Sequence, residues 1–172
     1  MRLSILPFVA LAGTALASGD TISAAINNIA NATIALNKTI TDWPRTLIGT
    51  LPIITKSTTL LAEIHKGTKV ARKSAPLSVD EALQVAQATI QLGSDVNTTL
   101  ETVIRAKSDF DRLLLSPVIL LNLELQRDAT EDFSQAIIDK VPEALQGNAE
   151  ALVKGIDASF EKAINKYSVL RR

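Results

Sequence analysis

Apolar residues recur along this chain in alternating steps of three and four, and no segment alternates apolar and polar residues at every second position. This spacing places the apolar residues of each segment on one stripe of an α-helix. The first stripe, which Pro44 ends, consists of Ile22, Ile26, Ile29, Thr33, Leu36, Ile40 and Trp43. Helical periodicity without a strand pattern predicts an all-α fold.

A second helix is predicted over about residues 45–72, where Pro52 marks either a kink or a late start. Its stripe consists of Leu47, Leu51, Ile54, Thr58, Leu61 and Ile64. The third helix begins at a capping box, in which the Ser78 hydroxyl accepts from the Glu81 N–H and the Glu81 carboxylate accepts from the Ser78 N–H. Its stripe consists of Leu83, Ala86, Ile90, Gly93, Asn97, Leu100 and Ile104.

Two prolines mark the remaining helices. Pro117 occupies the first turn of a helix that starts at Ser116 and runs to about Val141, and Pro142 opens another. A separate short helical piece is expected around residues 108–111. The last helix carries the stripe Leu145, Ala149, Leu152, Ile156, Phe160, Ile164 and Tyr167. Five helices with short connections predict an antiparallel five-helix bundle, tightly packed or with a central hydrophobic cavity.

The segment from Leu113 to Leu125 departs from this amphipathic pattern, because its aliphatic residues cover every side of a helix. It is too short to span a membrane. Such a segment is either the central member of a bundle or a surface held for an apolar partner, and burial is the expected state.

The first seventeen residues have the features of a secretory signal peptide: a basic Arg2, an apolar core from Leu3 to Leu16, and small residues at Ala15 and Ala17. We therefore expect residues 18–172 to form a single secreted domain. No hydrophobic tail follows Tyr167, so a released, extracellular product is expected, with association with the cell wall as the alternative. The chain contains no cysteine, so packing alone must stabilise the bundle, and its helices remain free to part.

The charge balance argues against one class of partner, and three sequons predict glycosylation. Eighteen basic residues balance eighteen acidic ones, which argues against nucleic-acid binding. Asn31, Asn37 and Asn97 each begin an Asn-x-Thr sequon and are predicted glycosylation sites, with Asn97 closest to an apolar stripe.

Residues suited to catalysis are scarce. The chain has no thiol, no Gly-rich phosphate loop and a single histidine, His65, so neither a nucleophilic triad nor a multi-histidine metal site is predicted. The acidic pairs Asp109/Asp111 and Glu131/Asp132 are typical of solvent-exposed helix faces and not of a catalytic carboxylate pair. We therefore expect no enzyme, no metal and no cofactor.

A set of short motifs runs in order through nearly all of residues 18–172. It consists of Trp43, Leu60-Leu61, Ile64, Gly67, residues 77–83, residues 96–99, Lys107, Phe110-Asp111, residues 115–120, residues 137–142, residues 155–157, Ala163-Ile164 and Tyr167. This ordered set resembles the fungal hydrophobic surface-binding protein A family, which includes the lipid-binding domains of cell-wall mannoproteins.

This resemblance implies a secreted five-helix bundle that binds lipids such as long-chain fatty acids in a central hydrophobic tunnel. The alternative it implies is adsorption to hydrophobic surfaces and recruitment of secreted hydrolases there. Cell-wall members of the family add Ser/Thr-rich segments and a GPI signal, which this chain lacks.

Periodicity, rather than a family motif, predicts the lipid-binding wall. Its nine residues are Leu61, Leu83, Ile90, Leu121, Leu125, Phe133, Ile137, Leu152 and Ile156. Thr58 and Ser94 lie near the stripes and are predicted either to orient a carboxylate or to bond back to their own helix.

Overall fold

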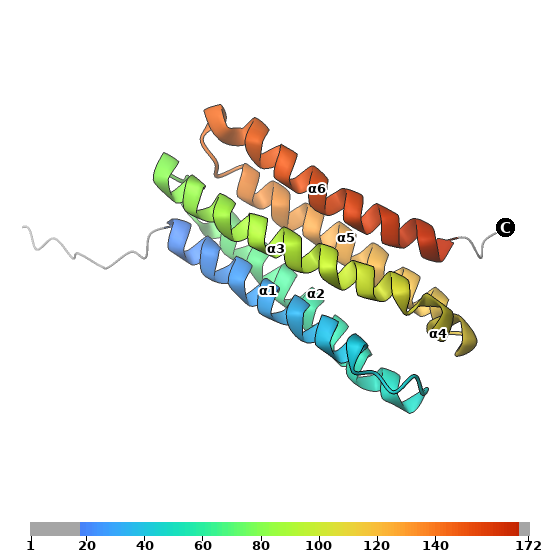
Figure 1. The fold of residues 1–172 in the computed structure, drawn as a ribbon. Coiled ribbons are helices and arrows are strands. Elements are labelled where there is room, and N and C mark those ends of the chain that lie inside the picture. The colour runs from blue at the N-terminus through green and yellow to red at the C-terminus, as the bar shows by residue number, and fades with distance from the viewer. Residues whose placement is uncertain (1–17, 169–172) are drawn as a thin grey trace, which may run out of the picture.

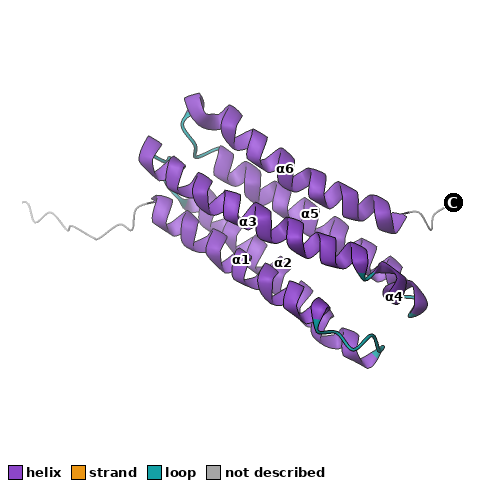
Figure 2. Cartoon of the chain, viewed as in Figure 1, coloured by secondary structure: helices purple, strands orange, loops and turns teal. Residues whose placement is uncertain are grey.

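The computed structural model describes residues 18–168, so the predicted signal peptide lies outside the described residues. Nearly all of this part of the chain is helical and none of it is strand (Figure 2). The helices are α1 (Ser18–Thr41), α2 (Leu51–Lys73), α3 (Val79–Arg105), the short α4 (Lys107–Arg112), α5 (Ser116–Ile138) and α6 (Glu143–Ser168). The all-α prediction is confirmed, but the described residues form six α-helices rather than five, because the turn at 107–112 makes a helix of its own.

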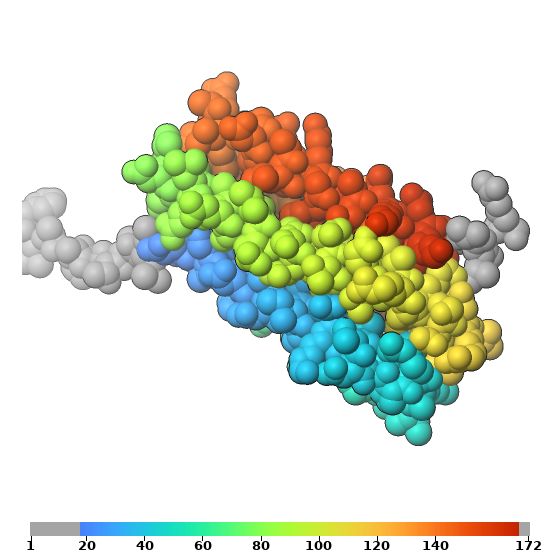
Figure 3. Space-filling model, in the orientation of Figure 1, coloured from blue at the N-terminus to red at the C-terminus, as the bar shows by residue number. Residues whose placement is uncertain are grey.

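The five long helices close into a ring in the order α1, α2, α5, α6, α3 and back to α1 (Figure 1). Helices consecutive in the chain run in opposite directions, whereas several ring neighbours are parallel. For example, Gly19 contacts Glu81 and Thr33 contacts Thr99 along α1 and α3. α6 contacts only α3 and α5 extensively, and Figure 3 shows it beside α3 on one face of the molecule.

Local signals in the sequence set the helix starts. The capping box at α3 is confirmed, with the Glu81 N–H donating to Ser78 Oγ at 3.3 Å and the Ser78 N–H donating to Glu81 Oε2 at 2.9 Å. Pro52 lies in the first turn of α2, so it marks a late start rather than a kink. A short 3-10 turn, Ile48–Thr50, precedes that start.

The buried stripe of α1 is the predicted one, but the predicted stripes of α2 and α3 are displaced by about one residue around the helix. α2 buries Ile53, Ser57 and Leu60 and leaves Leu51 and Ile54 exposed. α3 buries Ala82, Val85 and Leu92 and leaves Leu83 and Ile90 exposed. The error has a physical cause: on both helices two neighbouring stripes carry aliphatic residues, and small or hydroxyl-bearing residues such as Ser57 and Ala82 interrupt the buried one, so spacing alone does not select it.

α5 also differs from the expectation that its aliphatic segment is buried. Leu120 and Leu123 lie in the core, whereas Val118, Leu121 and Leu125 are exposed. The segment therefore has one buried face and one exposed apolar face.

The end of the bundle near α4 is held by ring stacking and an ion pair. Trp43 stacks on Phe110 with ring centroids 4.5 Å apart, and Arg45 Nε lies 2.9 Å from Asp109 Oδ2. Arg45 has a left-handed backbone, φ 61°, and its guanidinium donates to the carbonyls of Ile40 and Trp43 at the end of α1. These contacts join the α1–α2 connection to α4.

Candidate functional site

Three apolar pockets lie in a row inside the ring. The α6 pocket, between α3, α5 and the first half of α6, has about 100 Å³ of free volume. The central pocket is lined by all five long helices and holds about 30 Å³. The α2 pocket, at the end near α4, holds about 40 Å³.

Few side chains separate these pockets. Leu92, Thr130, Phe133 and Ile156 line both the α6 pocket and the central pocket. Gln126 lines both the central pocket and the α2 pocket. The three pockets are therefore adjacent along the bundle axis.

A polar cluster of Ser57, Asn122 and Gln126 lies between the central and α2 pockets. Gln126 Nε2 donates to Ser57 Oγ at 2.8 Å, and Ser57 Oγ donates to Asn122 Oδ1 at 3.0 Å. Asn122 Nδ2 donates to the Val118 carbonyl at 2.9 Å. Gln126 and Ser57 are buried, so this cluster places hydrogen-bonding groups within an otherwise apolar row.

The threonines that line the pockets present no free hydroxyl to them. Thr33, Thr99 and Thr130 donate to the carbonyls of Ile29, Asp95 and Gln126, four residues back on their own helices, at 2.7–2.8 Å. A threonine bonded in this way satisfies its donor within the helix.

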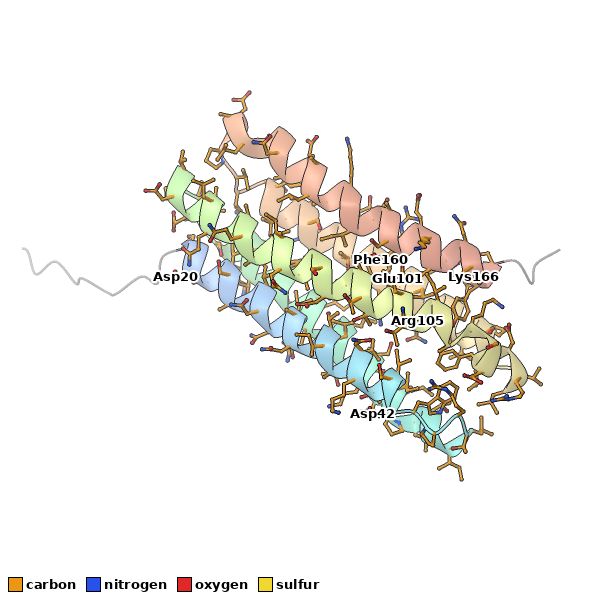
Figure 4. All side chains as sticks on the ribbon, viewed as in Figure 1. Asp20, Asp42, Glu101, Arg105, Phe160 and Lys166 are labelled. Carbon is orange, nitrogen blue, oxygen red and sulfur yellow. The ribbon has the colours of Figure 1, made fainter. Side chains whose placement is uncertain are left out.

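The first half of α6 is the least firmly packed part of the ring. From Glu143 to Gly155 no residue is fully buried, and the residues that face the α6 pocket are half-buried or exposed. The second half is anchored by the buried Ile156, Phe160 and Tyr167, and Figure 4 shows Phe160 near Glu101 at the seam with α3. The Tyr167 hydroxyl donates to the Val103 carbonyl at 2.8 Å, and its burial raises the pKa of that phenol.

The predicted wall residues divide into two groups. Leu83, Phe133, Ile137, Leu152 and Ile156 line the α6 pocket. Leu61 is half-buried against the core, whereas Ile90, Leu121 and Leu125 are exposed on outer faces, and none of these four lines the three axial pockets. Their role as lipid contacts remains a prediction.

Sequence reasoning missed the polar cluster. Thr58 is exposed and its hydroxyl bonds back to Ile54 O at 3.0 Å, which is the second of the two alternatives considered for it, and Ser94 is also exposed. Ser57 could have been found only from the correct register of α2, because its neighbours in the sequence are polar as well.

The other candidate residues lie on or near the surface. Asn31 and Asn97 are exposed, and Asn97 Oδ1 accepts from Ser159 Oγ at 3.3 Å. Asn37 is half-buried, and its Oδ1 is buried without a hydrogen-bond partner. His65 is exposed on α2. Within residues 18–168, no cluster of three potential metal ligands occurs, and no helix is long and apolar enough to span a membrane.

A ring of amphipathic helices around an axial row of apolar pockets defines a class of all-α bundles. A profile of the family described as hydrophobic surface binding protein A matches residues 19–139. The chain belongs to this family, which confirms the resemblance seen in the sequence.

Two fungal relatives are longer proteins. Cell wall mannoprotein 1 of Aspergillus flavus is 28% identical over 175 residues, which cover 97% of this chain and 63% of the relative. Cell wall mannoprotein 1 of Aspergillus fumigatus is 28% identical over 108 residues, covering 63% of this chain and 38% of the relative. The chain thus spans less than two thirds of the length of these relatives.

Solved structures share the fold. AFMP4P in complex with palmitic acid has a TM-score of 0.84 at 22% identity, over 87% of this chain and 99% of the other. Ligand binding domain 1 of Penicillium marneffei MP1 protein, complexed with arachidonic acids, has a TM-score of 0.84 at 20% identity, over 88% and 99% of the two chains.

Proposed function

We propose that this protein is a non-enzymatic lipid-binding protein that holds a long-chain fatty acid along the axis of its helix ring. The observation that carries this proposal is the row of three apolar pockets between the long helices, of which the central one is lined by all five. The structurally similar AFMP4P and MP1 domains, in complex with palmitic and arachidonic acids, support it.

The length of the row suits an acyl chain. Val118 lines the α2 pocket and Ile138 lines the α6 pocket, and these residues lie twenty positions apart on α5, or about 30 Å. The hydrocarbon core of a bilayer, which two acyl chains span end to end, is also about 30 Å thick. The row is therefore long enough for one extended chain and, when widened, for two.

The polar cluster supplies a position for the carboxylate. A buried carboxylate needs hydrogen-bond donors, and the Ser57 hydroxyl and the Gln126 amide can turn from each other toward a ligand in either adjoining pocket. The rest of the fatty acid then lies among Leu92, Phe133 and Ile156, toward the α6 pocket.

Binding requires the pockets to widen. A cavity of about 150 Å³ accepts one benzene molecule, and the α6 pocket is smaller than that, at about 100 Å³. The first half of α6 is the element that can move, because none of its residues is fully buried and a Cβ added at Gly147 or Gly155 would meet no atom within 4 Å. Its outward movement opens the α6 pocket while the second half stays anchored.

Native mass spectrometry with added palmitic acid tests the proposal. We expect a mass increase of one or two fatty acids and a concentration-dependent rise in melting temperature. The proposal would be contradicted if no lipid co-purified with the protein and added fatty acid changed neither its mass nor its melting temperature.

Matched variants locate the ligand. Ala86→Leu fills part of the α6 pocket and should weaken binding, whereas Ala24→Leu makes the same change at an exposed position of α1 and should not. Gln126→Leu should weaken palmitic acid more than its methyl ester, because only the acid needs the charged hydrogen bonds. Equal losses for both ligands would place the carboxylate elsewhere.

We also propose that the protein is secreted and functions outside the cell or at the cell wall. The signal-like sequence of residues 1–17 and the similarity to cell wall mannoproteins support this location. Exposure favours glycans at Asn31 and Asn97 over Asn37. Peptide mapping of the secreted protein after glycosidase treatment tests both points.

A further inference from the structure

Among residues 18–168, seven of the twelve exposed large hydrophobic residues lie at one end of the bundle. We call this the apolar end, formed by the α1–α2 connection, the start of α2 and the α4–α5 turn. Its exposed residues are Leu47, Ile48, Leu51, Ile54, Leu114, Val118 and Leu121. Ile48 and Leu114 are the most exposed of them, at 80% and 85%. A large patch of exposed apolar side chains marks an interaction site.

The apolar end is connected to the interior of the ring. Ile54 on α2 and Val118 on α5 are both exposed and both line the α2 pocket. The exposed rows of these two neighbouring helices therefore meet where that pocket approaches the surface.

Charge is distributed unequally between the two ends. The described elements at the apolar end, residues 38–60, 100–121 and 160–168, carry eight basic and five acidic side chains. The opposite end, residues 18–28, 70–90 and 132–150, carries three basic and seven acidic ones. In Figure 4, Asp20 lies at the acidic end, whereas Arg105 and Lys166 lie toward the apolar end.

The backbone holds one of these apolar residues in an unfavourable conformation. Leu114 follows α4 with φ 58°, a left-handed geometry that glycine and asparagine adopt more readily. Its N–H donates to the Asp111 carbonyl at 3.0 Å, which fixes the turn, while the side chain extends into solvent. A leucine that is strained in the backbone and unused in the core indicates a role at the surface.

We propose that the apolar end docks on an anionic lipid bilayer, so that the α2 pocket faces the acyl chains and takes its ligand from the membrane. The apolar residues enter the interface, and the surplus of basic side chains faces the anionic head groups. The purpose of docking rests on the proposed fatty-acid binding, but the docking itself can be measured separately.

Vesicle co-sedimentation tests the docking, with phosphatidylcholine alone and mixed with phosphatidylglycerol. We expect the protein to bind the mixed vesicles and to bind them more weakly as salt is added. Binding to vesicles of phosphatidylcholine alone should be weaker. The double variant Ile48→Asn, Leu114→Asn should lose about tenfold or more in partitioning. Neither position lines an axial pocket, and asparagine tolerates the left-handed backbone at 114.

Val79→Asn is the matched control, because Val79 is 55% exposed at the opposite, acidic end. It should leave vesicle binding unchanged. Equal losses in the control and the double variant would overturn the proposal, as would undiminished binding by the double variant. Binding to polystyrene beads without vesicle binding would mean that the partner is a hydrophobic solid and not a membrane. A wild-type dimer that dissociates in the double variant would mean that the partner is a second copy of the chain.

Free palmitic acid binding, measured on the same proteins without vesicles, keeps the two proposals apart. It should be the same in wild type and in both variants. Vesicle binding without fatty-acid binding would contradict the proposed function but not the docking. Fatty-acid binding without vesicle binding would contradict the docking but not the proposed function.

Discussion

Arg127 on α5 binds Asp157 on α6 through two hydrogen bonds, from Nε to Oδ1 at 2.6 Å and from Nη2 to Oδ2 at 3.1 Å. A third contact joins Nη2 to Glu161 Oε1 at 3.3 Å. The bond to Asp157 raises the pKa of Arg127 above its ordinary value. This group lies two residues beyond Gly155, where the loosely packed half of α6 ends, so it fixes the point about which that half can move.

Arg127→Gln should therefore loosen α6. We expect a loss of about 1 kcal/mol in the free energy of unfolding, because the pair is bidentate but partly exposed. Fatty acid should also dissociate faster from the variant, which stopped-flow fluorescence with a labelled fatty acid can measure. Lys38→Gln, which removes an exposed pair with Asp42, should change neither quantity. An unchanged dissociation rate in Arg127→Gln would show that α6 does not control ligand release.

Two glycines should respond in opposite ways to alanine. At Gly155 no atom lies within 4 Å of an added Cβ, so Gly155→Ala should stabilise the protein by up to about 1 kcal/mol through helix propensity. At Gly19 the added Cβ would lie 2.7 Å from Glu81 Cβ, so Gly19→Ala should be destabilising. Urea unfolding of both variants measures the difference, and a stabilised Gly19→Ala protein would mean that α1 and α3 are not so closely packed.

Acid should weaken the contact between α1 and α3. Hydrogen bonds from the N–H groups of Gly19 and Ser78 hold the pKa of Glu81 below its ordinary value. A lowered folded-state pKa gives stability that is present above the unfolded pKa, about 4.3, and is lost as the pH falls through the folded value. Glu81→Gln should be less stable than wild type at neutral pH and should lose less stability below about pH 4.3.

The same measurement separates Glu81 from the other carboxyls. Glu101 and Asp111 also have lowered pKa values, through Lys162 and Lys107 respectively, so the variant should keep part of the acid dependence. Identical pH profiles for wild type and Glu81→Gln would rule out the contribution of Glu81.

Leu114→Gly should stabilise the protein although it removes a large aliphatic side chain. The side chain is 85% exposed and the backbone is left-handed, so glycine relieves strain of roughly 1 kcal/mol and loses little packing. Thermal unfolding should show a higher melting temperature. A lower one would mean that the leucine has a packing partner in solution.

Features that depend on neighbouring residues in the sequence were predictable. The Ser78–Glu81 capping box, the start of α5 before Pro117 and the stripe of α1 all follow from local spacing. The contact of Glu81 with Gly19, sixty-two positions away, could not be predicted in this way, because the spacing of residues along one helix does not indicate which helix lies beside it.

The site was harder to predict than the fold. Ser57 on α2 and Ala82 on α3 are buried, whereas the larger Leu83 is exposed, so hydrophobicity alone does not select the buried side of these helices. Five of the nine residues expected to form a wall line the α6 pocket, whereas Ile90, Leu121 and Leu125 are exposed on outer faces. Closure of the ring, which decides inside from outside, is a property of all five long helices together.

The inward-facing threonines have a consequence for ligand exchange. Since Thr33, Thr99 and Thr130 each satisfy their donor on their own helix, empty pockets leave none of these hydroxyls unbonded. Loading the acyl part then exchanges only apolar contacts, at about 0.8 kcal/mol for each methylene buried. If the protein binds fatty acids as proposed, its affinity should therefore rise steadily with chain length rather than depend on one chain geometry.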